Sequence, residues 1–281
     1  MTNDNFLRLT FTQQPCYVLG DIHGNIHLVT DFVNEYDIDN CIIIVAGDIG
    51  LGFESEDFIL KRYSRINEIL VRKNIQLILL RGNHDDKYYF DEMKINLSNI
   101  KTIPDYTVIT VGDENILCVG GGISIDRIYR KKRYKELKNN YKKMWPKITD
   151  DALKDIVYPL YWYNEQIVFD FDKLTHINDD GIDINYVVSH SAPDFCHPQD
   201  KNGIQYWIDL DFQLEDDLTV ERGNLTSVFN FLKEKEHNLK AWAYGHFHMH
   251  HNDIYEDVMF TALMNMDNRF DYIELNKNLE M

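Results

Sequence analysis

The sequence predicts an α/β protein whose core is a layered sheet with mainly parallel strands. Through the first half of the 281-residue chain, short apolar runs alternate with amphipathic stretches of helical spacing. The apolar runs are continuous, which is typical of strands covered on both faces. An apolar fraction of 44% fits a folded globular chain and excludes a disordered or fibrous one.

The first half reads as strand, helix, strand, helix, strand. The strands are expected at 15–19, 41–46 and 75–80, and the helices between them at 25–36 and 58–72. In the second helix, Ile59, Ile66 and Leu70 recur at roughly helical spacing. This order of elements predicts a layered core with parallel strand pairing.

The second half is expected to be less helical. Strands at 106–111 and 116–119 flank a segment, Gly112-Asp113-Glu114-Asn115, that is typical of a hairpin turn. Further strands are expected at 184–189, 239–244, 257–264 and 271–275.

A basic stretch interrupts these strands. Residues 127–147 hold ten Lys and Arg side chains against one acid, Glu136, and an aromatic run follows at 158–163. We expect a largely helical insertion at about 123–165. The chain is otherwise expected to be a single domain of residues 1–281, because no repeat, low-complexity tract or Gly/Ser linker divides it.

The net charge and the cysteine content limit the binding partners and the cellular compartment that we expect. The formal charge of −17 repels polyanions on average, which counts against general nucleic-acid binding. The N-terminus has no apolar segment typical of a signal peptide, and no apolar run is long enough to span a bilayer. Cys16, Cys41, Cys118 and Cys196 are scattered without a CxxC pair. We therefore expect a cytoplasmic protein with free thiols and no membrane partner.

Five short segments carry the residues that point to chemistry, and four of them directly follow an expected strand. They are Gly20-Asp21-Ile22-His23-Gly24, Gly47-Asp48-Ile49-Gly50, Gly82-Asn83-His84-Asp85, Ser189-His190-Ser191-Ala192-Pro193 and Gly245-His246-Phe247-His248. Ligands of α/β sheets bind at the carboxyl ends of strands, so these side chains can converge although they are far apart in sequence.

The residue types favour a metal site. Imidazole and carboxylate groups suit Zn, Mn or Fe, and a carboxylate such as Asp48 can bridge two cations. Each segment alone has an ordinary alternative. Asp48 could cap a turn, Asn83 could be a turn residue, and His190 could be a half-buried histidine. The tract from His246 onward could be a histidine-rich surface. Five repeats of one pattern favour the metal interpretation.

The five motifs, in this order, resemble those of the calcineurin-like metallophosphoesterase superfamily, and residues 121–127 resemble a segment of its bacterial and phage branch. The resemblance implies a four-layer α-β-β-α sandwich and two divalent metal ions, with Mn, Fe and Zn as the candidates. It implies Asp21, His23 and His248 on the first metal, Asn83, His190 and His246 on the second, and Asp48 as the bridge.

The same resemblance implies hydrolysis of phosphate mono- or diesters by a metal-bound hydroxide, with His84 near the leaving group. Asp85 could orient His84. Arg81 and Arg127 could bind the phosphate, although Arg81 could also be a salt-bridged arginine at a strand end. Leu51 stands where Ser/Thr protein phosphatases have a second Asp, which leaves the partner of His84 open. The arginine that follows this Asp in those enzymes is also missing here, which weakens a phosphoprotein specificity.

The substrate stays open at this point. A phosphorylated small molecule or nucleotide is expected, and a Ser/Thr protein phosphatase or a nuclease with the same site is the alternative. A catalytically silent binding protein is disfavoured because all eight motif residues are present. The basic stretch could gather a polyanion or could be a solvated helical face, so nucleic acid is possible but not favoured. The aromatic run could stack a base, but we expect it to tether the insertion.

Overall fold

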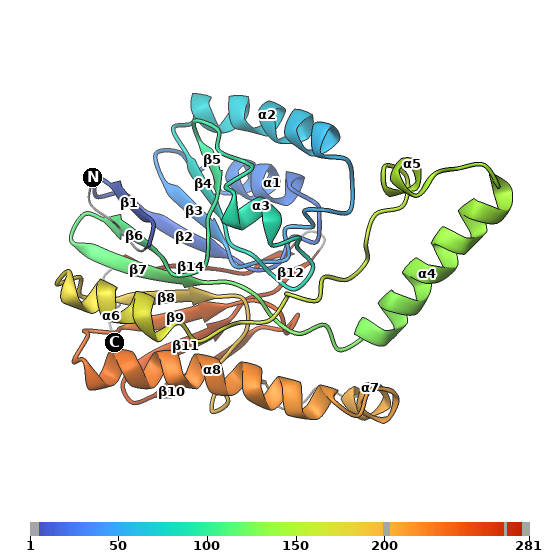
Figure 1. Ribbon diagram of the computed structural model, residues 1–281. Coiled ribbons are helices and arrows are strands. Elements are labelled where there is room, and N and C mark those ends of the chain that lie inside the picture. Colours follow the sequence, from blue (N-terminus) through green and yellow to red (C-terminus); the bar gives the residue numbers. More distant parts are fainter. Residues whose placement is uncertain (1–5, 199–202, 267–268, 277–281) are drawn as a thin grey trace.

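Two sheets lie face to face in the computed structural model, which describes residues 6–198, 203–266 and 269–276 (Figure 1). The five-stranded sheet has the order β14 (Tyr272–Glu274), β2 (Cys16–Leu19), β3 (Ile42–Val45), β4 (Gln76–Leu79), β5 (Ile100–Thr102). The seven-stranded sheet has the order β1 (Arg8–Phe11), β6 (Thr107–Val111), β7 (Glu114–Val119), β8 (Tyr186–Ser189), β9 (Ala241–Tyr244), β11 (Val258–Ala262), β10 (His251–Tyr255). A short pair, β12 (Asn265–Met266) and β13 (Arg269–Phe270), completes the described strands.

Helices cover the outer face of each sheet. The five-stranded sheet packs against α1 (His27–Glu35) and α2 (Glu56–Arg72), and the seven-stranded sheet packs against α6 (Phe171–Asp179) and α8 (Leu214–Glu234). The short helix α3 (Tyr88–Asp91) adds Tyr89 and Phe90 to the core under α1 and α2, and α7 (Ile204–Leu210) lies at one end of α8. The order is therefore α-β-β-α, which confirms the predicted four-layer sandwich.

Strand β3 shows why its apolar run is continuous. Ile42 and Ile44 point into the core between the two sheets, whereas Ile43 and Val45 point into the core under α1 and α2. Successive side chains of a strand alternate between faces, so a strand covered on both faces needs an apolar residue at every position. Strands β2, β3 and β4 pair in parallel, as predicted, and β5, which was not expected from sequence, also pairs in parallel with β4.

The predicted strands and the first two helices all exist, within a few residues at each end. The expectation that the second half is less helical is wrong, because α8 is 21 residues long. Its signal was present: Leu214, Leu218 and Leu225 lie on one buried face at helical spacing. Strand β10 was missed because all five of its residues are exposed, so no apolar periodicity marks it. Only its antiparallel backbone pairing with β11 defines it.

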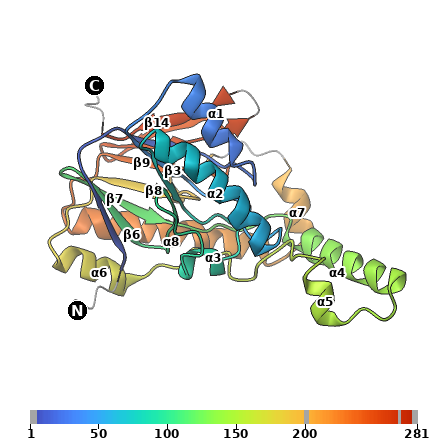
Figure 2. The ribbon, with the colours of Figure 1, turned by 90° about the horizontal axis from the view of Figure 1, so that it is seen from above.

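The predicted helical insertion extends away from the sandwich (Figures 1 and 2). It consists of α4 (Arg127–Met144), α5 (Asp150–Lys154) and a returning segment, and we call residues 127–163 the basic arm. Trp162 is buried in the returning segment and its ring packs edge-on against Phe53, 4.8 Å between centroids. This contact tethers the basic arm to the core, as expected for the aromatic run.

No helix in the described residues is both long and apolar enough to cross a bilayer. All four cysteines are buried free thiols.

We expect Ile44→Ala to lower the free energy of unfolding by about 2–5 kcal/mol, because the truncated side chain leaves a cavity between the two sheets. Ile44 is fully buried, whereas Ile254 on β10 is 74% exposed. Ile254→Ala is therefore the matched control and should change stability by no more than about 0.5 kcal/mol. Urea denaturation followed by circular dichroism measures both, and equal losses in the two variants would contradict the buried interface.

Candidate metal centre

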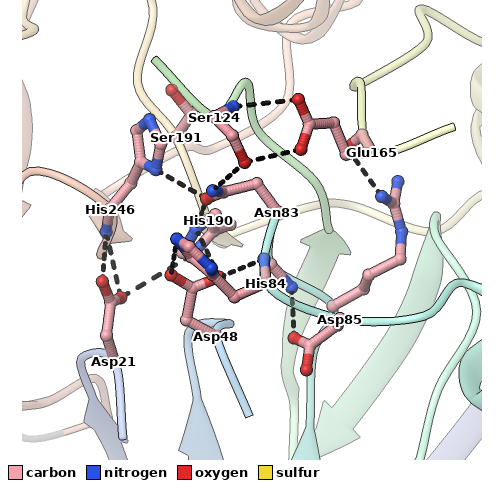
Figure 3. Close-up of polar contacts among 12 residues, drawn as sticks. Asp21, Asp48, Asn83, His84, Asp85, Ser124, Glu165, His190, Ser191 and His246 are labelled. Atoms are coloured by element: carbon pink, nitrogen blue, oxygen red, sulfur yellow. Dashed lines mark hydrogen bonds and ion pairs between the residues drawn. The ribbon is translucent and has the colours of Figure 1, made fainter. Parts of the chain in front are cut away.

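The loops that follow five parallel strands meet at one edge of the sandwich. Three of them follow β2, β3 and β4 of one sheet, and two follow β8 and β9 of the other. Figure 3 shows the side chains that these loops direct toward a common centre: Asp21, Asp48, Asn83, His190 and His246. The two sheets thus contribute complementary parts of one site.

The first group of ligand atoms comes from Asp21, His23, Asp48 and His248. One side-chain atom from each lies within 4.8 Å of all the others. His23 Nε2 and His248 Nε2 are 2.9 Å apart, and His248 Nε2 is 3.3 Å from Asp21 Oδ2. Oxygen and imidazole nitrogen atoms at this spacing fit a single divalent cation.

The second group is centred on the Asn83 amide oxygen. Asn83 Oδ1 lies 2.9 Å from His190 Nε2 and 2.9 Å from His246 Nδ1. His190 Nε2 is also 3.3 Å from Asp48 Oδ1, so Asp48 adjoins both groups. On the other side of its ring, His190 Nδ1 donates to the carbonyl oxygen of Ala46 at 2.8 Å. A neutral His190 therefore presents the Nε2 lone pair to the site.

The buried charged groups of the centre shift each other's pKa values. Burial raises the pKa of the Asp48 carboxyl, but the His190 and His84 imidazoles outweigh burial and hold that pKa well below its usual range. In His190, burial lowers the pKa, but Asp48 and Asp21 outweigh it and raise the pKa to about 10. A bound cation supplies the positive charge that a proton on His190 otherwise supplies. The seven residues of the two groups therefore fit two divalent cations that share Asp48.

The backbone at the site is strained. His23, Asp48, His246 and His248 adopt positive φ angles of 44°, 50°, 68° and 51°. Residues with a side chain rarely adopt this left-handed conformation, and it persists only where surrounding structure enforces it. Two of these candidate ligands, His23 and Asp48, follow strands of one sheet, and His246 and His248 follow a strand of the other.

Two glycines allow this close approach. A Cβ atom at Gly47 would lie 2.2 Å from His190 Nδ1, and one at Gly82 would lie 2.1 Å from Asp48 Oδ1. Gly47 also has a φ of 104°. Any side chain at either position would displace a ligand, which explains the glycine before Asp48 and before Asn83.

A buried pair of hydrogen-bonding residues fixes the orientation of Asn83. Asn83 Nδ2 donates to Ser124 Oγ at 2.9 Å, and the backbone N–H and hydroxyl of Ser124 donate to Glu165 at 2.9 and 2.6 Å (Figure 3). The Asn83 amide nitrogen is therefore held away from the centre, and its oxygen faces His190 and His246. Neither Ser124 nor Glu165 was identified from sequence, because only the fold brings them to Asn83.

Asp85 has a different role from the one expected. Its buried carboxylate accepts hydrogen bonds from four backbone N–H groups, those of Ile49, Gly50, Leu51 and Gly82. Asp85 therefore fixes the loop after β3 to the loop after β4, and its oxygens are directed at the backbone and not at the His84 ring.

Arg81 is directed into the protein. Its side chain is 1% exposed, Nη1 donates to the Glu165 carbonyl oxygen at 2.7 Å, and Nη2 pairs with Asp105 at 2.8 Å. A phosphate in solution cannot reach a guanidinium so placed. The geometry is that of the alternative, a salt-bridged arginine at a strand end.

Arg127 is likewise occupied. Its side chain is buried, Nε pairs with Asp211, and Nη1 pairs with Asp217 at 2.6 Å. These two ion pairs anchor the first turn of α4 to the segment around α7 and α8. They replace the expected contact with phosphate.

A different arginine reaches the site. Arg130 Nη2 lies 3.3 Å from His84 Nε2, and Arg130 Nε donates to Asp126 at 2.6 Å. Arg130 and His84 both line a cavity of about 770 Å³ that also includes His23 and His248. Arg130 was noted in sequence only as part of the basic stretch, because choosing it over Arg127 requires the rotational phase of α4.

Comparisons with known proteins agree with the motifs. A family model described as calcineurin-like phosphoesterase matches residues 15–250. The catalytic subunit of serine/threonine-protein phosphatase 6 from Drosophila melanogaster is 30% identical over 125 residues, 39% of this chain and 40% of that protein. The catalytic subunit of serine/threonine-protein phosphatase 4 from Kluyveromyces lactis is 30% identical over 138 residues, 43% of each chain. Each match thus spans less than half of the relative's length.

Solved structures are more distant. The phosphopantetheinyl hydrolase of Mycobacterium tuberculosis covers 89% of each chain at 15% identity, with a TM-score of 0.40. The alignment with a putative 5′-nucleotidase from Staphylococcus aureus covers 88% of this chain and 48% of the nucleotidase chain, at 13% identity and with a TM-score of 0.41. Similarity at this level carries no information about the chemistry of the site.

We expect Ser124→Ala to weaken divalent-metal binding about 10- to 100-fold, because the Asn83 amide loses the acceptor that fixes its orientation. Isothermal titration with Mn²⁺ measures the effect, with thermal unfolding as the check on folding. Ser227→Ala is the matched control, because this hydroxyl donates only to the Gly223 carbonyl oxygen within α8. Unchanged metal affinity in Ser124→Ala would contradict the positioning role.

Proposed function

Because the chain belongs to the calcineurin-like phosphoesterase family, we propose that it hydrolyses phosphate mono- or diesters at a centre of two divalent cations. The observation that carries this proposal is the sharing of Asp48 by the two ligand groups, directly beside a cavity lined by His84 and Arg130. The ligand assignment is Asp21, His23 and His248 for the first cation, Asn83, His190 and His246 for the second, and Asp48 for both.

Divalent cations in such a centre neutralise charge on phosphoryl oxygens and lower the pKa of a nearby water molecule. The chain's own residues supply the rest. Arg130 carries a fork of N–H donors that can bind phosphoryl oxygens in two places at once. It therefore takes the phosphate-binding role that sequence alone offered to Arg81 and Arg127.

His84 is positioned to move a proton. His84 lines the cavity, and its Nε2 atom is 3.9 Å from Asp48 Oδ2 and 3.3 Å from Arg130 Nη2. Burial lowers the pKa of His84, Asp48 opposes that shift, and Arg130 adds to it. A phosphate ester bound beside the ring brings negative charge, which favours the protonated imidazole. His84 can then donate to the departing oxygen.

The cavity suits a small phosphorylated molecule or a nucleotide. Its volume of about 770 Å³ lies within the range of small-molecule sites. Beyond the metal ligands it offers the Phe53 ring and the Arg62 guanidinium, which pairs with Glu54 at 2.6 Å. An aromatic ring and a guanidinium in the same cavity suit a base or a second anionic group of the substrate.

A phosphoprotein substrate is the second candidate, favoured by the two partial matches to protein phosphatase catalytic subunits. The loop after β3 weakens it, because Leu51 is buried where an acid is expected in those enzymes. We also propose Mn²⁺ as the cation to test first and a reducing compartment such as the cytoplasm, where four buried thiols stay free.

The central test is hydrolysis of p-nitrophenyl phosphate and of bis(p-nitrophenyl) phosphate by protein loaded with Mn²⁺. We expect turnover of at least one ester, its loss on chelation with EDTA, and its recovery on adding metal. Asp48→Asn should lose both turnover and the second metal per chain, measured by elemental analysis, because the residue adjoins both groups. Asp113→Asn in the exposed hairpin turn is the control. No metal-dependent turnover of either ester would sink the proposal.

His84→Asn and Arg130→Gln separate proton transfer from phosphate binding. His84→Asn should keep both metals and lower kcat about 10²- to 10⁴-fold, as expected for loss of a proton donor. Arg130→Gln should lower kcat/KM about 10- to 100-fold, because it removes a charge-assisted hydrogen bond of about 1.5–3 kcal/mol. The control is Arg133→Gln, one α4 turn further along and paired only with Glu136 at 3.9 Å among the described residues. Metal loss in His84→Asn would instead make His84 a ligand.

A further inference from the structure

We propose that the basic arm binds single-stranded nucleic acid and leads one of its phosphodiester groups into the metal centre. This inference rests on the proposed function, since it names a substrate class for the same site. It depends on the charge of the arm, on its exposed aromatic rings, and on where α4 begins.

The charge of α4 is opposite to that of the chain. Residues 127–147 carry ten Lys and Arg side chains and one acid, within a protein of formal charge −17. Ion pairs account for part of this charge: Arg127 with Asp211 and Asp217, Arg130 with Asp126, and Lys142 with Asp150. Arg133 also lies 3.9 Å from Glu136, and several lysines of the helix remain without an ion pair among the described residues.

Lys132, Lys135 and Lys143 lie on one exposed side of α4 and form no ion pair within the described part of the chain. Lys131 and Lys138 lie three or four residues from Lys135. Like charges at this helical spacing repel each other and destabilise a helix. An anionic partner from outside the chain removes that repulsion, and a polyanion with evenly spaced charges matches a row of lysines.

Aromatic rings are interleaved with these cations. Tyr129, Trp145 and Tyr163 of the basic arm are 56%, 47% and 86% exposed. The Lys131 ammonium lies 4.3 Å from the centroid of the Tyr161 ring. Exposed rings beside a positive surface stack unpaired bases, which is the usual mode of single-strand binding. Tyr and Trp rings also suit membrane and protein interfaces, so the rings alone do not select the partner. The position of Arg130 beside the candidate phosphoesterase centre favours a partner with phosphodiester groups.

The inner end of the helix lies at the candidate active site. Arg130, in the first turn of α4, lines the cavity beside His84. The whole of α4 has 18 residues, a length of about 27 Å at 1.5 Å per residue, and it runs outward from the sandwich (Figures 1 and 2). A single strand of nucleic acid that lies along α4 would therefore have one phosphate group beside Arg130, which we assign to phosphate binding.

Binding is measured by fluorescence anisotropy, with the full chain in Mn²⁺ and a fluorescein-labelled phosphorothioate 12-mer of thymidine that resists cleavage. The arm variant replaces Lys132, Lys135 and Lys143 with Gln. It should weaken binding at least tenfold and reduce the slope of log Kd against log salt by about two, because single strands lose about 0.7 per phosphate contact. Tyr163→Ala should weaken binding about tenfold through lost stacking.

The matched control replaces Lys61, Arg65 and Arg72 on α2 with Gln, which removes the same charge from another exposed helix. It should bind within twofold of the unmodified protein. All of these variants should hydrolyse bis(p-nitrophenyl) phosphate equally, because none of the substituted residues lines the cavity of the metal centre.

Equal oligonucleotide binding by the arm variant and the unmodified protein would overturn the inference. So would arm-dependent co-sedimentation with phosphatidylserine vesicles in the absence of oligonucleotide binding. Absence of diester hydrolysis in every protein would instead count against the proposed function, while the binding comparison would still decide the role of the arm.

Discussion

The Asp48 carboxylate ties the two sheets together at the point where their loops meet. Its Oδ1 atom accepts the backbone N–H of His84 at 2.8 Å and lies 3.3 Å from the ring of His190 on the other sheet. Burying an unpaired carboxylate is costly, so the surrounding imidazoles and backbone must stay close to it. The positive φ angles and the glycines of the neighbouring loops follow from that requirement.

Around this carboxylate, tightly hydrogen-bonded loops face a cavity wall made of longer side chains. The ligand loops are fixed from below by Asp85, which binds four backbone N–H groups, and from the side by Ser124 and Glu165. The cavity wall opposite is built from longer side chains, Arg62 and Arg130, each held by one acidic partner. Such an arrangement keeps the reacting centre constant and lets the bound molecule vary.

Sequence patterns predicted a layered α/β core and the loops that the structure brings together, and the family resemblance added the four-layer order. The core and the loops depend on local signals: apolar runs for buried strands, and a glycine followed by Asp, Asn or His at strand ends. The direction of a long side chain is not such a signal. Arg81 and Arg127 had the right type and place, yet each is turned into the protein by an acid far away in sequence. Glu165 and β10 were missed for the same reason, since only tertiary contacts define them.

The short link from Asn83 through Ser124 to Glu165 joins the metal centre to the base of the basic arm. Glu165 lies two residues beyond the arm's returning end, and its carbonyl oxygen also receives Arg81. Three buried side chains thus form a continuous hydrogen-bonded connection between the base of the arm and the amide oxygen that faces His190 and His246. The orientation of a candidate ligand therefore depends on a residue that belongs to the insertion and to neither sheet.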